Sequence, residues 1–358
     1  KTYYLFACID LLAVIFSVMQ WSGLIISLSF FMDNPRFRNW KVLCWNVRGL
    51  NSEKCQRDVR AKIEESNCSI VCLQETKCES FDLKFIRQFC PRRFDNFAFA
   101  PSHGASGGIL VVWNSAFFSG CLIEIQRFAV VVSFTSVHNS EVWNLVSVYG
   151  PCDGPLRDDF VQWLYHLQIP VDANWLLLGD FNFIRSLDNR NLPGGDVNDI
   201  FLFNEIIGHL GLLELPLKGR AYTWSNMQQQ PLLEQLDWFF TSSSWISLYP
   251  NTVVHPLART GSDHIPCLVS IDTTIPRAKV FRFENYWVDL PGFMDCVTAS
   301  WNAPLACSGS AATIISKKFK RLRSDLKRWH INLASIKKVI LTCSKVILCL
   351  DTLEECMP

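Results

Sequence analysis

The sequence has almost no net charge. Its 34 Lys and Arg residues nearly balance 33 Asp and Glu residues, which leaves a formal charge of +1 at pH 7. A protein that binds nucleic acid through its overall charge would be strongly basic, so such binding here would have to come from a local basic face. The net charge alone favours no class of partner.

Paired cysteine motifs are also absent. The 15 cysteines are odd in number and scattered, and several lie in apolar runs such as "VLCWN" and "SIVCLQ". No CxxC pair occurs, and Cys68 and Cys72 lack a matching His or Cys pair downstream, which argues against a structural zinc site. We therefore expect a reduced, intracellular protein of the nucleus or cytoplasm.

The chain also lacks internal repeats, low-complexity tracts and a "YxDD" polymerase motif. Its 358 residues suffice for one large domain with extensions, or for two domains. Residues 1–33 form an apolar run long enough to span a bilayer, interrupted by Asp10 and Gln20. One interpretation is a membrane helix or signal anchor, and the other is a non-native leader. We favour the leader, because the chain begins with Lys rather than Met.

Residues 39–273 have the pattern of one α/β or α+β domain with packed sheets. Helices are expected at about 155–167 and 199–210, and an earlier helix is expected to begin after Asn51 or Ser52 as N-cap. Turn residues separate the short strand-like runs. These runs are "WKVLCWN", "SIVCLQE", "GGILVVWN", "CLIEIQRF", "VVVSFTSV", "VWNLVSVYG", "NWLLLGD", "AYTW", "QLDWFF", "TVVHPL" and "HIPCLVSI".

Residues 276–358 differ in composition. The stretches "KKFKRLRSDLKRWH" and "INLASIKKVILTCSKVILCL" predict helices with a basic segment. We favour a solvated helical linker, and the alternative is an arm that contacts phosphates.

Polar residues end several of the apolar runs. Asn46 follows "LCW", Glu75 follows "VCLQ", Tyr149 follows "LVSV", and Asp180 with Asn182 follows "LLLG". Ligand sites in α/β proteins lie at strand ends, so these side chains are expected to converge on one rim. Each residue taken alone also fits a turn, a cap or a solvated position.

A phosphodiester hydrolase needs a divalent cation on the phosphate oxygens. Mg²⁺ prefers a few hard oxygen ligands with water, and Mn²⁺ is an alternative ion. Glu75, Asp263 and the amide oxygen of Asn46 could provide these ligands.

Such an enzyme also needs a base and a donor for developing negative charge. Asp180, held by Asn182, could orient or deprotonate water. His264 in "GSDHIP" could donate to the phosphate, and Asp237 in "QLDWFF" could keep its imidazole charged and oriented.

Seven motifs occur in an order similar to that of the endonuclease/exonuclease/phosphatase superfamily, which includes pancreatic DNase, abasic-site endonucleases and the endonuclease domain of LINE-type retrotransposons. The resemblance covers about Trp40 to Ser270, and "GRAYTWSN", "LDWFFTSSSW" and "KVFRFENYW" resemble the plant branch of LINE-type elements. It implies a DNase I-like fold, a four-layered α/β sandwich of two mixed β-sheets flanked by helices, and Mg²⁺-dependent cleavage of DNA. The motifs are "WNVRGL", "LQETK", "SGGILVVWN", "VYGP", "GDFN", "LDWFF" and "SDHIP".

The resemblance also implies a role for each matched residue. Its metal-side positions match Asn46, Glu75 and Asp263. Its catalytic positions match Tyr149 at the scissile phosphate, the water-activating pair Asp180 and Asn182, the buttressing Asp237 and the catalytic His264, while Thr223 and Asn226 fall where related endonucleases contact the DNA backbone.

The sequence departs from this pattern at three places. Arg48 stands where abasic-site enzymes carry an acidic residue, and Trp238 stands where many relatives have Arg or Tyr. The chain also ends at Pro358, before the reverse transcriptase that would follow in a full-length element.

Three functions are compatible with the sequence. The leading hypothesis is a metal-dependent endonuclease that nicks one DNA strand and leaves a 3′-hydroxyl to prime reverse transcription. The second is a catalytically silent retrotransposon remnant with at most weak DNA binding. The third is a phosphodiesterase that acts on inositol or lipid phosphates at a membrane.

Overall fold

The structure, a computed structural model, describes residues 37–104, 106–170, 172–276, 287–288, 290–305, 310–333 and 335–356. The apolar run at residues 1–33 lies outside the described residues, so neither interpretation of it is tested. Within the described ranges, no helix is both long and apolar enough to cross a bilayer.

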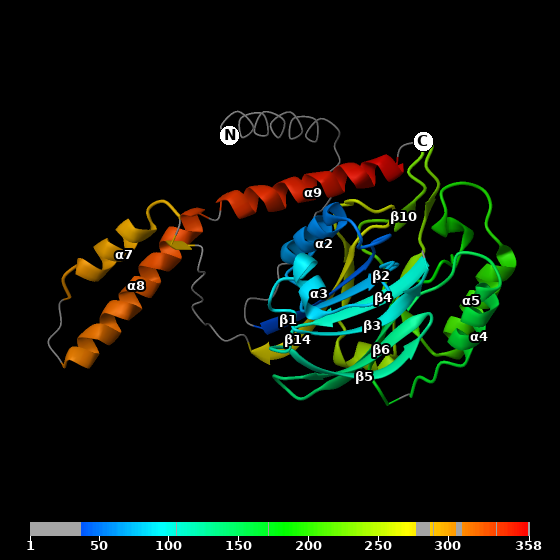
Figure 1. The fold of residues 1–358 in the computed structure, drawn as a ribbon, viewed down its shortest axis with the longest axis horizontal. Coiled ribbons are helices and arrows are strands. Elements are labelled where there is room, and N and C mark those ends of the chain that lie inside the picture. Colours follow the sequence, from blue (N-terminus) through cyan, green and yellow to red (C-terminus); the bar gives the residue numbers. More distant parts are fainter. Residues whose placement is uncertain are drawn as a thin grey trace. The chain divides into compact units, whose positions relative to one another are not determined.

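Two six-stranded mixed sheets form the centre of the fold (Figure 1). The first has the order β13-β14-β1-β2-β4-β3, and the second has the order β5-β6-β7-β8-β12-β9. The strands of the first sheet are β1 Phe37–Asn46, β2 Ile70–Gln74, β3 Asn96–His103, β4 Ser106–Trp113, β13 Val253–Pro256 and β14 Cys267–Pro276. Those of the second are β5 Phe118–Gln126, β6 Ala129–Ser136, β7 Val142–Tyr149, β8 Trp175–Asp180, β9 Leu213–Glu214 and β12 Asp237–Thr241.

Helices cover the outer faces of both sheets. Helices α2 and α3 pack on the first sheet, and α4 and α5 pack on the second, which confirms the predicted four-layered sandwich. A small hairpin of β10 and β11 lies outside the two sheets. The remaining bounds are α2 Glu53–Ser66, α3 Leu83–Phe89, α4 Leu156–Tyr165, the 3₁₀ turn Leu187–Asn189, α5 Val197–His209, β10 Trp224–Ser225, β11 Leu233–Glu234 and α6 Ser243–Leu248.

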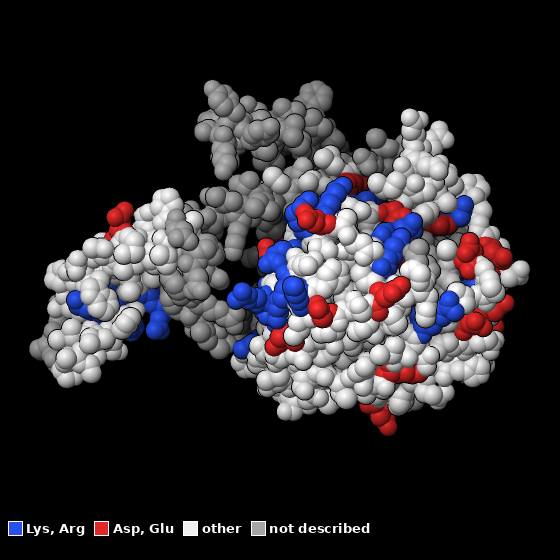
Figure 2. All heavy atoms as spheres, in the orientation of Figure 1, with Lys and Arg blue, Asp and Glu red and all other residues white. Residues whose placement is uncertain are grey.

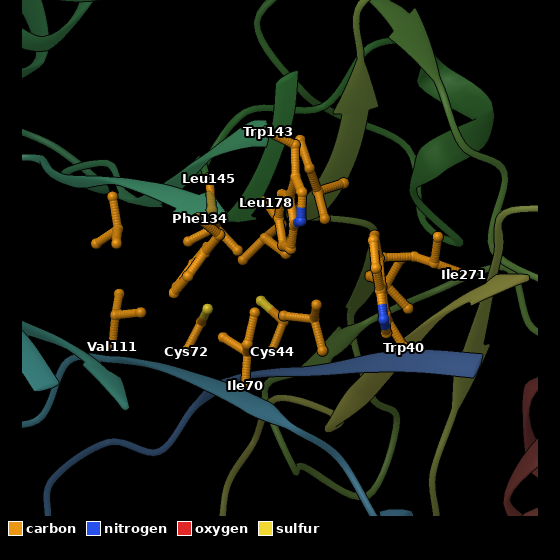
Figure 3. Packing of buried hydrophobic residues seen from close by; sticks show 14 of the residues in the cluster. Trp40, Cys44, Ile70, Cys72, Val111, Phe134, Trp143, Leu145, Leu178 and Ile271 are labelled. Carbon is orange, nitrogen blue, oxygen red and sulfur yellow. The ribbon is translucent and has the colours of Figure 1, made fainter. Parts of the chain in front are cut away.

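The alternation of residues along the strands produces the layers. In β1, Val42 and Cys44 face the second sheet, whereas Leu43 and Trp45 face α2 and α3. Figure 3 shows the inner layer, where side chains from both sheets meet between the ribbons. Because both faces of the central strands are buried, their sequences are apolar almost throughout.

Local capping fixes where the helices begin. The Ser52 hydroxyl accepts a hydrogen bond from Cys55 N, so of the two predicted caps, Asn51 and Ser52, it is Ser52 that caps α2. Asp196 caps α5 in the same way, and one face of this helix buries Phe203, Ile206 and Ile207 against the second sheet.

The C-terminal segment is helical, as its composition predicts. Its helices are α7 Phe293–Asn302, α8 Ala311–Leu333 and α9 Ser335–Cys356. Helix α7 packs on α8 around a small apolar cluster that contains Trp287, Phe293 and Leu326.

Close packing of β7 and β8 depends on Gly179. A Cβ atom at this position would lie 2.0 Å from the Val148 carbonyl oxygen, and the residue has φ +141°. Only glycine accommodates both the contact and the backbone conformation. The next residue, Asp180, is therefore placed where two strands approach unusually closely.

Replacing Gly179 with Ala should lower the free energy of unfolding by about 3 kcal/mol or more, because the new methyl group collides with backbone. Urea unfolding followed by circular dichroism measures this loss. The matched control is Gly208→Ala on the exposed side of α5, where a Cβ meets nothing within 4 Å and helix propensity favours alanine. Equal stability of the two variants would contradict the packing argument.

Candidate active site

The polar strand ends meet at one edge of the sandwich. Strands β1 and β2 run parallel in one sheet, and β7 and β8 run parallel in the other, so their carboxyl ends carry Asn46, Glu75, Tyr149 and Asp180. A hydrogen bond from Gln74 Nε2 to Ser147 Oγ (3.0 Å) joins the sheets beside this edge.

Two antiparallel strands begin at the same edge. Asp237 is the first residue of β12 and pairs directly with Asp180 of β8. Asp263 and His264 lie shortly before β14, and Trp45 Nε1 donates to the His264 carbonyl oxygen over 3.1 Å. The fold thus brings together residues more than 200 positions apart in the chain.

A buried imidazole lies between two carboxylates. His264 Nδ1 is 2.9 Å from Asp237 Oδ2, and His264 Nε2 is 3.5 Å from Asp180 Oδ2. All three side chains are at most 3% exposed. A buried imidazole with a carboxylate on each nitrogen is held in one orientation, and the contact between Asp237 and His264 is the one predicted from the sequence.

Two amides hold the Asp180 carboxylate. Asn46 Nδ2 donates to Oδ2 over 2.8 Å, Asn182 Nδ2 donates to the same atom over 3.2 Å, and the Asn182 backbone N–H donates to Oδ1 over 3.0 Å. Asn182 has φ +54°, and its amide also donates to the Gly150 carbonyl oxygen. Such a conformation is uncommon outside glycine and indicates a constrained position.

Burial and charge shift the proton affinities of this group. Burial raises the pKa of Asp180 to about 7, with the cationic His264 opposing and Asp237 adding to the rise. Burial lowers the pKa of His264, but the charges of Asp237 and Asp180 outweigh it and raise that pKa to about 9. The imidazole is therefore protonated at neutral pH.

A second group of charges adjoins the first. Arg48 Nη1 lies 3.7 Å from Glu75 Oε2 and 3.5 Å from Asp263 Oδ2. Lys77 Nζ lies 3.1 Å from Glu75 Oε1, and Trp224 Nε1 donates to Asp263 Oδ2 over 3.0 Å. The carboxylates of Glu75 and Asp263, which are far apart in the sequence, therefore both face the Arg48 guanidinium.

Tyr149 lies between the two groups. Burial and the neighbouring carboxylates of Glu75 and Asp180 raise the pKa of its phenol well above its ordinary value. The hydroxyl therefore keeps its proton and is a hydrogen-bond donor at any physiological pH.

Asn46 is placed differently from a simple metal ligand. Its amide nitrogen donates to Asp180, and its oxygen accepts the Arg48 backbone N–H over 3.1 Å. The residue therefore joins the carboxylate of the buried group to the loop that carries Arg48, and its oxygen retains one lone pair.

The two predicted DNA-contact residues take different positions. Thr223 has no exposed surface, and its hydroxyl accepts the backbone N–H groups of Leu236 and Asp237, so in this conformation its side chain positions Asp237 and is turned away from solvent. Asn226 is partly exposed, and its oxygen accepts from Gln228 N and Leu232 N in the β10–β11 turn. Its contact with DNA stays a prediction.

Trp238, which departs from the family pattern, is a buried packing residue. It is 1% exposed, and its indole N–H donates to the Phe183 carbonyl oxygen over 2.7 Å. The departure from Arg or Tyr at this position therefore changes packing beneath the site.

Three residues that support the site were not predicted from the sequence. Ser262 Oγ donates to the Asn46 carbonyl oxygen over 2.8 Å and accepts from His264 N, while Trp224 and Lys77 hold the two outer carboxylates. Each is adjacent or close in sequence to a predicted residue, but only the fold shows what it contacts.

Two groups of residues have ligand types suited to a metal. Asp180, Asp237 and His264 have ligand atoms within 4.8 Å of one another. Their imidazole is protonated and enclosed by its two carboxylates, so neither ring nitrogen has a lone pair to give, and burial leaves little room for the waters that Mg²⁺ retains. Glu75 and Asp263 are hard oxygen donors that both face the Arg48 guanidinium, and Asn46 carries a further amide oxygen that contacts the Arg48 backbone, so this donor set fits a divalent ion.

A model of the Endonuclease/Exonuclease/phosphatase family matches residues 43–264, more than half of the chain. The chain belongs to this family. The matched segment contains all of the residues in the two charged groups described above.

A transposon protein is similar to this chain in sequence. Over 183 residues the chain is 23% identical to the Transposon TX1 uncharacterized 149 kDa protein of Xenopus laevis, covering 49% of this chain and 14% of that protein. The chain thus spans about one seventh of that relative's length.

Two solved structures share the fold of this family member. The AP endonuclease LMAP from Leishmania major superposes with a TM-score of 0.53 and 17% identity, over 66% of this chain and 88% of LMAP. The endonuclease domain of TRAS1, a telomere-specific non-LTR retrotransposon, gives a TM-score of 0.50 and 16% identity, over 65% of this chain and 98% of that domain. These similarities confirm the DNase I-like α/β sandwich.

The protonation of His264 can be measured directly. In NMR titrations of the metal-free protein labelled at histidine, His264 should stay protonated through pH 7.5 and titrate near 9, whereas His255, whose pKa is lowered by burial and the nearby Lys41 and Lys218, should titrate below its ordinary value. Asp237→Asn should lower the pKa of His264 toward 6.5, because it removes the charge of the closest carboxylate.

The same shift has a consequence for stability. A raised folded-state pKa means that the contribution of His264 is complete below about pH 6.5 and is lost as pH rises through about 9. A His264 resonance that titrates near pH 6.5 in the unmodified protein would contradict this assignment.

Proposed function

We propose that this family member is a metal-dependent DNA endonuclease that nicks one strand and leaves a 3′-hydroxyl. The observation that carries the proposal is the buried Asp180–His264–Asp237 group, which borders the Glu75 and Asp263 carboxylates at the rim of the sandwich. A base, a proton donor and a cation site therefore lie next to one another, as hydrolysis of a phosphodiester requires.

Asp180 is suited to act as the base. Its N–H donors fix its orientation, and its pKa of about 7 makes it a stronger base than an ordinary carboxylate while leaving it substantially ionised at pH 7.5. In this arrangement Asp180 orients a water molecule and accepts its proton.

His264 and Tyr149 are suited to hold the phosphate. The His264 imidazolium is stabilised by Asp237 and supplies positive charge for the negative charge that develops on the phosphate oxygens. The Tyr149 hydroxyl keeps its proton and donates a hydrogen bond. Neither group needs to gain a proton before the reaction.

Glu75, Asp263 and the Asn46 oxygen would hold Mg²⁺ or Mn²⁺. Family members generally use divalent metals, and such an ion, when bound, polarises the phosphate and stabilises the leaving oxygen. Asn46 would then link this ion to the base, because its other amide atom donates to Asp180.

DNA is the proposed substrate because of the proteins that the chain resembles. The proteins that resemble the chain are described as an AP endonuclease, a retrotransposon endonuclease domain and a transposon protein. We infer from these proteins that this chain also cleaves DNA. In a full-length element the nick would prime a reverse transcriptase, and such an element would act on nuclear DNA.

Helix α8 offers a surface for phosphates outside the active site. Lys317, Lys320, Arg323 and Lys327 are exposed at spacings of three to four residues, and none of the four has an ion pair within the described residues. On the face of the sandwich shown in Figure 2, by contrast, acidic and basic side chains are intermixed. We propose that α8 contacts the DNA backbone, in preference to the solvated-linker interpretation.

A plasmid assay tests the catalytic proposal. With Mg²⁺ the protein should convert supercoiled plasmid into the open-circular form, and Asp180→Ala and His264→Ala should each reduce the rate at least about a hundredfold, because each removes an acid–base group. A DNA polymerase should extend the nicks without prior phosphatase treatment, since each carries a 3′-hydroxyl.

The control is His209→Ala, which alters an exposed histidine that stacks on Tyr165 far from the site residues in sequence. It should retain full activity. If the unmodified protein and the three variants cleaved the plasmid at equal rates, the activity would come from a contaminant. Cleavage of inositol phosphates but not of DNA would contradict DNA as the substrate.

Salt dependence tests the role of α8. Replacing Lys317, Lys320 and Lys327 with Gln should weaken DNA binding and reduce the slope of log K against log salt by about 0.9 for each phosphate that the helix no longer neutralises. Fluorescence anisotropy in Ca²⁺, with Arg92→Gln as the control at an exposed loop outside α8, measures both quantities. An unchanged slope would leave α8 as a linker.

A further inference from the structure

The loop after β1 places a cation inside the candidate metal site. Arg48 stands where abasic-site enzymes carry an acidic residue, and its backbone has φ +54°. Its N–H donates to Asn46 Oδ1 over 3.1 Å, which fixes the start of the side chain next to the site. The position of Arg48 is therefore set by backbone geometry and not by its charge alone.

The guanidinium is shared by two carboxylates. One nitrogen, Nη1, lies 3.5 Å from Asp263 Oδ2 and 3.7 Å from Glu75 Oε2. Both distances exceed those of a good N–H···O hydrogen bond, so the contact is a charge–charge interaction with loose geometry. The Arg48 side chain is 50% exposed, whereas that of Glu75 is 8% exposed.

The local charges balance without any metal. Glu75 and Asp263 contribute two negative charges, and Arg48 and Lys77 contribute two positive charges within 4 Å of them. Mg²⁺ binds such oxygens at about 2.0–2.1 Å. Because Nη1 faces the same two oxygen atoms, the ion and the guanidinium cannot both take this position.

We propose that Arg48 is a displaceable counter-ion of the metal site, whose guanidinium occupies the space between Glu75 and Asp263 and must leave before a divalent cation binds there. The inference rests on the proposed function only in taking these carboxylates as the metal ligands. The half-exposed Arg48 side chain can turn toward solvent, where its guanidinium is hydrated, while Lys77 remains beside Glu75. Arg48 thus lowers the affinity of the site for metal while stabilising the metal-free form.

Metal binding measured without DNA tests the proposal. Isothermal titration with Mn²⁺ on the full chain should show about tenfold tighter binding by Arg48→Met than by the unmodified protein, because a competing positive charge is removed. The metal-free Arg48→Met protein should also have a lower melting temperature, since Glu75 and Asp263 lose a partner. If Arg48 had a purely structural role, its replacement would lower both the melting temperature and the metal affinity. A lower melting temperature together with a higher metal affinity is therefore expected only if the guanidinium and the metal ion compete.

Three further variants complete the design. Arg48→Gln, whose polar side chain suits a half-exposed position, should show the same tightening if the Met variant folds poorly. Arg57→Met removes a comparable ion pair with Glu53 on the surface of α2 and should leave the affinity unchanged. Glu75→Gln should weaken Mn²⁺ binding and so identify the titrated site.

The outcomes separate this inference from the proposed endonuclease function. Tighter Mn²⁺ binding by both Arg48 variants supports it even if no DNA is cleaved. Unchanged or weaker binding by both Arg48 variants, or no Mn²⁺ binding by any variant, overturns it, including in the case where the plasmid assay succeeds.

Discussion

The buried ion pair between His264 and Asp237 is the interaction on which the rest of the site depends. An imidazolium that is almost fully buried is stable only with a carboxylate at hydrogen-bond distance, and the 2.9 Å contact supplies it. Asp237 is in turn fixed by Thr223, whose hydroxyl accepts the Asp237 backbone N–H. Removing the positive charge would leave Asp180 and Asp237 facing each other across a dry pocket. The remaining site residues are arranged around this constraint.

The site has a fully buried part and a more accessible part. The buried part holds Asp180, Asp237 and His264, whose protons are controlled by burial and mutual charge. The more accessible part holds Glu75 and Asp263 beside the half-exposed Arg48. In the proposed function this division would separate proton transfer, which benefits from a fixed and desolvated base, from cation binding, which requires exchangeable water.

Much of the fold was predictable from sequence because the local signals agree with the final packing. Apolar runs with polar ends predicted β1, β2, β7 and β8, and Ser52 marked the start of α2. Helix α3 was missed because its two turns are too short to show a period, and β3 was missed because Pro101 normally argues against a strand. Pro101 is tolerated there because β3 is at the edge of its sheet and needs no donor on that side.

The residues of the site were predictable in type but not in their contacts. Motif order selected Asn46, Thr223 and Arg48 as positions of interest, but local sequence does not show that Asn46 turns its nitrogen to Asp180 or that Thr223 faces inward. The position of Arg48 between Glu75 and Asp263 depends on strands that are paired across more than 200 residues. Such contacts follow from sheet topology, which local patterns do not encode.

The direct pairing of Asp180 with Asp237 across β8 and β12 has an evolutionary consequence. Charged groups at this edge contribute little to cohesion of the layers, which the three apolar clusters supply. Substitutions that replace the buried charges by well-packed neutral side chains tend to leave a scaffold equally or more robust. A copy of this domain released from selection would therefore lose the charged group long before the architecture, so a well-formed sandwich is no measure of whether that group still serves a reaction.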